Sequence, residues 1–124
     1  MNHKKKNNRM ELLCFLGAGE GTWGQVAGVI NKGDWESIIL VGTDFARKFN
    51  SQKDFEFIEI NSAGIVEMKE NILKKLQGKI KGTEVALSIA SGNGKEHMAL
   101  ISAILNLPAG IRFTALTKDG IIFM

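Results

Sequence analysis

Short apolar runs alternate with longer segments of helical character along the whole chain, and this alternation limits the fold more than any other feature. The apolar runs are of strand length and lie at 11–16, 36–41, 55–60, 84–90 and 111–116. Such a pattern is typical of parallel strands joined by helical crossovers that cover both faces of a sheet. We therefore predict an α/β protein, a three-layer sandwich with a mainly parallel sheet of about six strands.

The segments between the strands predict four helices, at about 22–31, 44–49, 63–77 and 95–106. The third is amphipathic, and Ser62 is its expected N-cap. Near the end of the chain, Lys118-Asp119-Gly120 separates two strand-like runs. Asp-Gly between such runs is a strong hairpin signal, so we expect 121–124 to close the sheet as an antiparallel strand.

Length and charge limit the domain organisation. The 124 residues, 44% of them hydrophobic, suffice for one compact domain over 11–124, and residues 1–10 form a basic, polar tail that we expect to be disordered. Lys4, Lys5, Lys6 and Arg9 supply four of the basic residues, and without them 12 basic residues stand against 13 acidic ones. The domain itself therefore gives no strong signal for DNA binding.

Reactive side chains are few. Cys14 is the single cysteine and the chain has two histidines, so we expect neither a disulfide framework nor a metal site. No apolar run is long enough to span a membrane. These features favour a cytoplasmic protein without membrane association.

Two glycine-rich loops carry the functional signal. Gly17–Gly24 follows the first strand, and Ser91–Lys95 follows the fourth and leads into a helix. Glycine lets backbone N–H groups approach an anion closely, and the start of a helix attracts negative charge. We therefore predict one nucleotide-binding site without a required cofactor. Its candidate ligand-binding residues are Gly17, Gly19, Gly21, Thr22, Trp23, Ser91, Gly92, Asn93, Gly94 and Lys95.

The first loop permits a second interpretation. Gly19, Gly21 and Gly24 match the dinucleotide fingerprint G-x-G-x-x-G, and Asp44 follows 20 residues later as a candidate ribose acceptor. A small NAD- or mononucleotide-binding domain that regulates a partner protein is therefore the alternative. The long loop and the bulk of Trp23 count against it.

Individual side chains in and near this loop have open roles. Trp23 either staples the loop to the helix below or offers a stacking surface to a base. We expect Glu20 to face solvent or a base edge, because it would repel phosphate. Thr43, Asp44 and His97 are secondary candidates at the border of the site.

The second loop is not a P-loop, because the glycine spacing is too short and no Ser or Thr follows Lys95. It fits an anion nest with a lysine beside it. The alternative is an ordinary helix cap, made by Ser91 or Asn93, with Lys95 solvated. The helix that follows reads apolar all round from Met98 to Leu105, which indicates either a dimer interface or enclosure by neighbouring helices.

The order of elements, the Ser-Gly-Asn-Gly-Lys turn, the apolar helix and the closing hairpin together resemble a CARF domain, the Rossmann-like sensor module associated with CRISPR systems. The resemblance covers about residues 11–124, and this chain has one additional glycine, Gly94, before Lys95. It implies a homodimer that joins through the 95–106 helix and binds a cyclic oligoadenylate between the subunits. Gly19–Trp23 and Ser91–Lys95 would then line a symmetric pocket.

The resemblance also bears on activity. Such domains usually carry an effector, for which this chain has no room, so a separate effector protein is one implied partner. Some stand-alone members cleave the ring, and Lys95 and Thr22 would be the catalytic candidates by position. No general base is evident in the sequence, so binding is expected more than catalysis.

Overall fold

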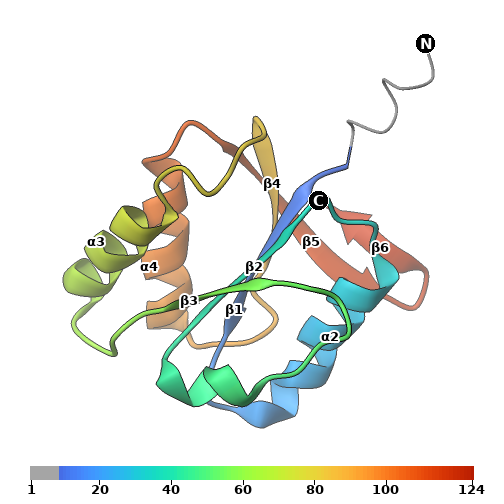
Figure 1. Cartoon of the computed structure of the whole chain (residues 1–124), viewed down its shortest axis with the longest axis horizontal. Helices are drawn as coiled ribbons and strands as arrows, with labels where there is room; N and C mark the ends of the chain where they lie inside the picture. The colour runs from blue at the N-terminus through green and yellow to red at the C-terminus, as the bar shows by residue number, and fades with distance from the viewer. Residues whose placement is uncertain (1–8) are drawn as a thin grey trace.

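The computed structural model describes residues 9–124, so the predicted tail lies outside the described residues except for Arg9 and Met10. Figure 1 shows three layers, with α3 (Ile65–Leu76) and α4 (Gly94–Leu105) on one face of the sheet and α2 (Trp23–Lys32) on the other. The strands are β1 (Glu11–Leu16), β2 (Ile38–Gly42), β3 (Glu56–Glu59), β4 (Glu84–Ser88), β5 (Gly110–Thr117) and β6 (Gly120–Phe123), and two 3₁₀ helices, η1 (Glu20–Thr22) and η2 (Asp44–Lys48), follow β1 and β2.

The strand order is β3-β2-β1-β4-β5-β6, and every neighbouring pair is parallel except β5 with β6. This confirms the predicted Rossmann-like α/β sandwich with its closing antiparallel hairpin. The turn Lys118-Asp119-Gly120 works as expected, since Gly120 has a φ of +101°, which favours glycine over other residues.

The core forms on both faces of the central strand. β1 is buried along its whole length and shares its sides between two apolar clusters. Leu13 and Phe15 point toward α3 and α4, whereas Leu12, Cys14 and Leu16 point toward α2. This alternation is what a strand covered on both faces requires.

One helix start differs from the prediction. α3 begins at Ile65 with Gly64 as N-cap and no side-chain capping bond, so the expected Ser62 cap is wrong. Gly64 is extended, with φ −64° and ψ 160°, and its carbonyl oxygen accepts the first helical bond from the Met68 amide at 2.9 Å. Backbone geometry rather than a hydroxyl therefore sets this helix start.

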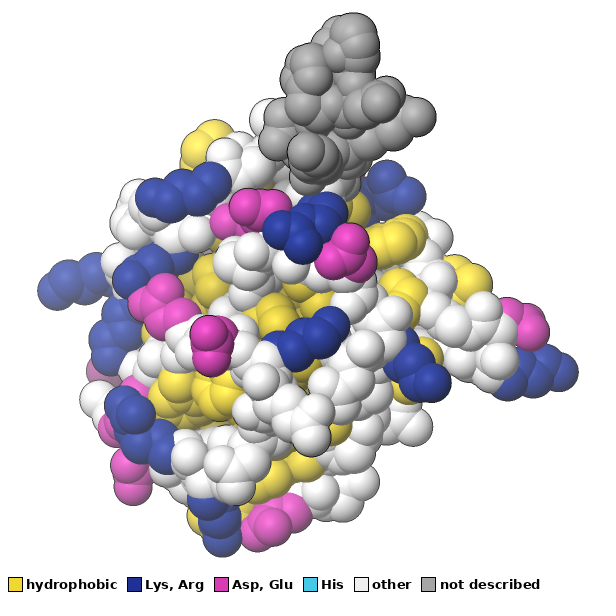
Figure 2. Space-filling model, turned by 45° about the vertical axis from the view of Figure 1, so that its right-hand side comes forward, with side chains coloured by type: hydrophobic (Ala, Val, Ile, Leu, Met, Phe, Trp, Pro, Cys, Tyr) yellow, Lys and Arg dark blue, Asp and Glu magenta, His cyan; other side chains and the backbone are white. Residues whose placement is uncertain are grey.

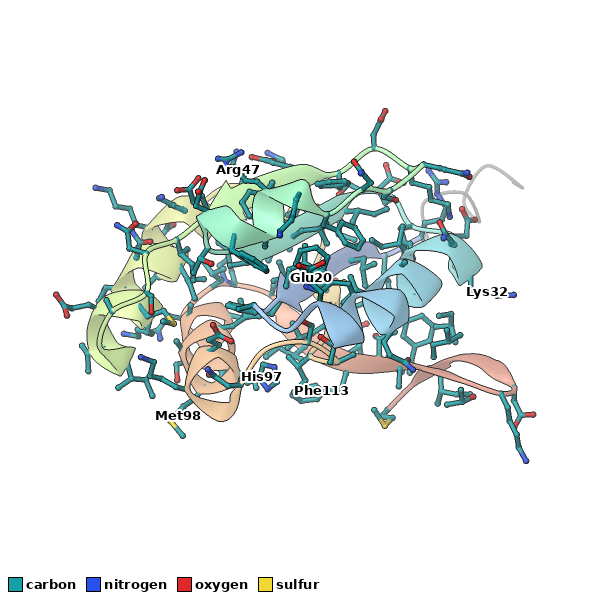
Figure 3. The ribbon with its side chains drawn as sticks, turned by 90° about the horizontal axis from the view of Figure 1, so that it is seen from below. Glu20, Lys32, Arg47, His97, Met98 and Phe113 are labelled. Carbon is teal, nitrogen blue, oxygen red and sulfur yellow. The ribbon has the colours of Figure 1, made fainter. Side chains whose placement is uncertain are left out.

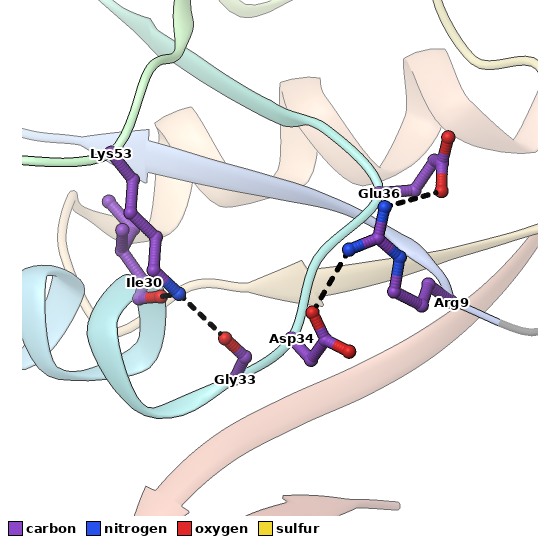
Figure 4. A network of polar contacts seen from close by, with 6 residues as sticks. All are labelled: Arg9, Ile30, Gly33, Asp34, Glu36 and Lys53. Atoms are coloured by element: carbon purple, nitrogen blue, oxygen red, sulfur yellow. Dashed lines mark hydrogen bonds and ion pairs between the residues drawn. The ribbon is translucent and has the colours of Figure 1, made fainter. Parts of the chain in front are cut away.

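Two polar contacts hold the region after α2 (Figure 4). The Lys53 ammonium donates to the carbonyl oxygens of Ile30 at 3.0 Å and Gly33 at 2.8 Å, where the helix leaves its last carbonyls unpaired. Arg9 bridges Asp34 and Glu36, at 3.1 Å each. The second contact fixes the chain as it enters β1.

Charged side chains of both signs stand beside one another on the face shown in Figure 2, with apolar side chains between them. Arg47 pairs with two acidic neighbours, most closely with Glu59 at 2.6 Å, and Lys48 pairs with Glu20 at 3.2 Å. Among residues 9–124, no helix is long and apolar enough to cross a membrane.

Candidate functional site

The two glycine-rich loops lie at the carboxyl ends of β1 and β4, which are adjacent in the sheet. From β1 the chain turns outward to β2 and β3 on one side, and β4, β5 and β6 extend the sheet on the other. Open α/β sheets bind ligands at this reversal of strand order. The sequence therefore placed both candidate loops at the edge where a site is expected.

The two loops touch each other directly. A Cβ atom added to Gly17 would lie 2.7 Å from the Cα and N atoms of Gly92, so only glycine fits there. The Gly17 amide donates to the Ser91 hydroxyl at 2.8 Å, across 74 residues of sequence. Ser91 is fully buried, and its side chain joins the two loops through this hydrogen bond.

The Thr22 hydroxyl extends this connection. It lies 2.7 Å from the Ser91 hydroxyl and 2.9 Å from the carbonyl oxygen of Gly19. A carbonyl oxygen can only accept, so the Thr22 hydroxyl donates its proton to Gly19. The Ser91 hydroxyl then donates its own proton to the Thr22 oxygen. Thr22, although exposed, is therefore tied into the loop framework.

Gly92 is fixed as glycine for two reasons. Its φ is +104°, and an added Cβ would meet the Phe15 ring at 2.8 Å, the His97 ring at 3.0 Å and the Glu96 carboxylate at 3.1 Å. The turn is therefore packed from below by β1 and by the first turn of α4.

The helix that follows begins with a capping box. The Asn93 side-chain oxygen accepts from the Glu96 amide at 2.8 Å, and the Glu96 carboxylate accepts from the Asn93 amide at 2.8 Å. Of the two capping residues considered, Asn93 is the cap and Ser91 is not. A carboxylate of the chain itself thus occupies part of the positive end of α4.

Lys95 and His97, both in the first turn of α4, bond to different parts of the chain. The Lys95 ammonium donates to the carbonyl oxygen of Ala63 at 2.7 Å and remains exposed. His97 Nε2 lies 2.7 Å from the carbonyl oxygen of Ser91, so this nitrogen carries the proton, and the ring packs edge-on against Phe15. Lys95 therefore stays exposed beside the turn, whereas His97 supports the loop.

Trp23 anchors the first loop. Its indole nitrogen donates to the carbonyl oxygen of Gly17 at 2.9 Å, and its ring packs against Phe45 and Phe49. This agrees with the staple interpretation, although the ring packs against η2 and the Phe49 that ends it rather than against the helix below.

The acidic and polar candidates near η2 are exposed. Glu20 faces solvent as predicted and pairs with Lys48. Asp44 is 85% exposed in its side chain and lies 3.8 Å from the Arg47 guanidinium. Thr43 is half-buried at the start of η2 and makes no capping bond with its side chain.

Four glycines at this edge have no internal reason to be glycine. An added Cβ on Gly19, Gly21, Gly24 or Gly94 would meet no heavy atom within 4 Å, and none of the four has a positive φ. Gly28 behaves differently, because its Cβ would lie 2.5 Å from the Leu116 side chain. At these four positions the backbone of the two loops at this edge of the sheet is therefore not covered by side chains.

The structure adds a crevice that the sequence analysis did not find. β4 and β5 stop pairing after Leu87 and Phe113, and a cavity of about 250 Å³ opens between the diverging strands. It is lined by Gln25, Val29, Leu87, Ser88, Ile89, Ala90, Phe113, Thr114, Ala115, Leu116 and Met124. The available signal was Ser88, the one polar residue inside the otherwise apolar run 85–90.

A larger hollow, of about 1130 Å³, lies at the opposite, amino-terminal edge of the sheet. There the buried Glu11 carboxylate accepts from the amides of Lys81 and Gly82, at 2.8–3.0 Å. The acid therefore holds the loop before β4 in place. No sequence-predicted site residue borders this hollow.

Below the crevice, Cys14 and Ser88 are partners in the β1–β4 register and both are buried. Burial raises the pKa of the Cys14 thiol to about 12, an effect that the neighbouring Ser88 hydroxyl partly opposes. The two groups do not reach hydrogen-bond geometry, so the Ser88 hydroxyl has no partner. The thiol is therefore neutral and unreactive in the folded chain.

Within residues 9–124, no group of three or more His, Cys, Asp or Glu side chains is placed to hold a metal ion. What the edge offers instead is glycine backbone with open space beside it and an exposed ammonium. Comparison of the chain with protein-family models, with curated proteins and with solved structures finds no match.

Proposed function

We propose that this chain binds a nucleotide through its phosphate groups, at the loops that follow β1 and β4. The observation that carries the proposal is the set of open glycines, Gly19, Gly21, Gly24 and Gly94, whose missing side chains serve no contact within the chain. Glycine without an internal cause is favoured where a ligand approaches the backbone closely. The close contact between Gly17 and Gly92 holds the two loops next to each other.

The chemistry of the edge suits a phosphate. The amides at the start of α4 and the Lys95 ammonium supply donors and positive charge, and Lys95 is anchored only by Ala63. Turnover has less support, because the bases at this edge are already engaged: His97 with the Ser91 carbonyl oxygen, Glu96 in the capping box, and Glu20 and Asp44 with basic neighbours. Binding, rather than ring cleavage by Lys95 and Thr22, is the function proposed.

An exposed apolar face supports a homodimer. Met98 and Leu105 on α4 are 60% and 71% exposed. On the neighbouring β5–β6 hairpin, Ile122 is exposed and Phe113 is half-buried, and Met124, which follows β6, is exposed. Figure 3 shows Met98 and Phe113 on the same side of the molecule, with His97 between them. The helix is not enclosed within one chain, and a second copy would cover it.

A two-fold axis that passes near the start of α4 would bring the Ser91–Lys95 loops of two subunits together, because each loop leads directly into that helix. A ligand with two-fold symmetry then fits best. A cyclic oligoadenylate, the ligand implied by the resemblance to CARF domains, is such a ligand. A separate effector protein would read out the binding.

The alternative ligand is NAD, favoured by the strand order β3-β2-β1-β4-β5-β6. In the dinucleotide fingerprint the third glycine permits close packing of helix and strand. Here Gly24 faces open space, and Gly28 makes the close approach instead. The spacing of the motif is therefore present, but its third glycine does not play the expected part.

Thermal denaturation of the full chain against cyclic tetra- and hexa-adenylate, NAD, ATP and AMP tests the ligand class. A ligand that binds only the folded state stabilises it by about 2.7 kcal/mol at 100 times its dissociation constant. The double variant Gly21→Ala, Gly94→Ala should fold normally and lose the shift. Gly110→Ala is the matched control, because its Cβ has only ordinary contacts, at 3.7 Å, at the opposite edge. No shift with any nucleotide would contradict the proposal.

Sedimentation velocity tests the dimer. Met98→Glu places a charge in the proposed interface and should yield monomers. Val66→Glu is the matched control, since Val66 is 69% exposed on α3, outside that face. A wild-type chain that sediments as a monomer at high micromolar concentration, with and without ligand, would contradict the dimer and leave nucleotide binding open.

A further inference from the structure

The crevice between β4 and β5 adjoins the proposed phosphate site along the chain. Ile89 and Ala90 form one of its walls, and Ser91 and Gly92 follow directly in the chain. From Ala90 to Gly94 the chain can extend at most about 14 Å, a span that a single nucleoside monophosphate can cover. One ligand can therefore occupy the crevice and reach the glycines at the start of α4.

The walls of the crevice are apolar with a few polar groups. Val29 and Leu116 form the side nearer α2, and Phe113 and Met124 line it from β5 and the end of the chain. The Gln25 amide, with donors and an acceptor, stands exposed at the rim. Flat apolar walls with few polar groups are the usual surroundings of a bound aromatic ring.

One polar group in the crevice is buried without a partner. Ser88 is 1% exposed, lines the cavity, and its hydroxyl makes no hydrogen bond within the described chain. A buried hydroxyl without a partner lowers stability, and the neighbouring Cys14 thiol does not reach hydrogen-bond geometry with it. A ligand atom in the crevice would supply the missing partner.

A polar strand edge lies beside this hydroxyl. The Phe113 carbonyl oxygen faces β6, where it accepts from the Met124 amide at 2.8 Å. In an extended strand the next carbonyl points the other way, so that of Thr114 faces the crevice. The Thr114 hydroxyl donates its proton to the Arg112 carbonyl oxygen at 2.9 Å, so it too can offer a ligand only an acceptor.

The size of the crevice limits its occupant. Pockets for drug-sized ligands have roughly 300–1,000 Å³, and this one has about 250 Å³. It therefore holds one ring system and not a whole dinucleotide. We infer that the crevice is the base subsite of the proposed nucleotide site, in which the Ser88 hydroxyl bonds an edge atom of the nucleobase. This inference rests on the proposed function.

Calorimetric titration of the full chain with paired probes tests the inference. The pairs are AMP, GMP, CMP and UMP, each against ribose 5-phosphate, which has the phosphate and sugar but no base. The variant is Ser88→Ala, and Ser37→Ala, on an exposed serine at the opposite edge of the sheet, is its matched control. Because Ser88→Ala removes an unpartnered buried hydroxyl, the variant should fold and be no less stable than the wild type.

The expected result is that at least one nucleoside monophosphate binds tenfold or more tightly than ribose 5-phosphate. Ser88→Ala should weaken the binding of that nucleotide roughly fivefold, as expected for loss of one hydrogen bond. It should leave the affinity for ribose 5-phosphate unchanged. Ser37→Ala should change neither. Increased stability together with weaker binding of the base is a combination that a purely structural serine would not give.

Two results would overturn the inference and are distinct from each other. Equal binding of ribose 5-phosphate and every nucleotide, or equal effects of Ser88→Ala on both, would exclude a base subsite in the crevice while leaving the phosphate site standing. Failure of every probe to bind would remove the phosphate site and the base subsite together.

Discussion

Gly17→Ala is the substitution that should most clearly separate packing from chain entropy in this molecule. The added methyl group would lie 2.7 Å from two backbone atoms of Gly92, which cannot move aside as the end of a side chain can. Overpacking of this kind costs about 1–3 kcal/mol. Separation of the loops would also break the Gly17–Ser91 hydrogen bond, worth about 1 kcal/mol.

The expected loss is therefore about 2–4 kcal/mol of unfolding free energy, or roughly 8–16 °C in melting temperature for a chain of this size. Urea denaturation monitored by far-UV circular dichroism and by Trp fluorescence measures it, with an unchanged m-value. Gly19→Ala is the matched control, because its Cβ has open space and its φ is not positive.

That control should be neutral or more stable by up to about 1 kcal/mol, since alanine restricts the unfolded chain. Equal stability of Gly17→Ala and Gly19→Ala would refute the reasoning, because the close approach of the two loops would then not exist in solution. A loss in both variants would refute the claim that Gly19 faces open space.

Four further results are expected. Ser91→Ala should lower the free energy of unfolding, measured by urea denaturation, by about 1–3 kcal/mol, because the buried Gly17 amide loses its acceptor. Its control is Ser62→Ala, at an exposed position without a capping role, which should lower that free energy by less than about 0.5 kcal/mol. Lys53→Met should lower stability by about 1–2 kcal/mol, because it removes both bonds to the end of α2 while keeping the aliphatic stem. Cys14 should resist a thiol reagent at pH 8 until urea unfolds the chain, because its folded pKa is about 12. That pKa is raised above 9.0, its value in the unfolded chain, so the contribution of Cys14 to stability is present below pH 9 and is lost as the pH rises from 9 toward 12. A pH series of melting temperatures checks this loss. Rapid labelling of the folded chain at pH 8 would contradict the raised pKa.

The sequence predicted the sheet well because its signals are local. Alternating strand and helix lengths and the Asp119-Gly120 turn depend on residues close in the chain. The start of α3 was misplaced because a serine was preferred as cap, whereas the extended backbone at Gly64 sets the helix start. Propensity rules rank cap residues but do not fix where the backbone turns.

The site was predicted as two loops but not as an interlocked pair. The contact of Gly17 with Gly92 and the bond to Ser91 join residues about 75 positions apart, and no local pattern encodes them. The crevice depends on where β4 stops pairing with β5, and the apolar run 84–90 gives no sign that pairing ends at Leu87. Ser88 is the one polar residue between Val85 and Ala90, and a single serine in a buried strand is weak evidence for a crevice.

The Glu96 carboxylate in the capping box changes what kind of anion can bind at α4. Because it is tethered one turn from the Asn93 amide, its effective local concentration is on the order of millimolar or more. A free monovalent ion such as chloride would have to displace this internal competitor for a single contact. A ligand that also engages the open glycines of the first loop would gain several contacts at once, so we expect the capping box to favour such a ligand over a simple salt ion.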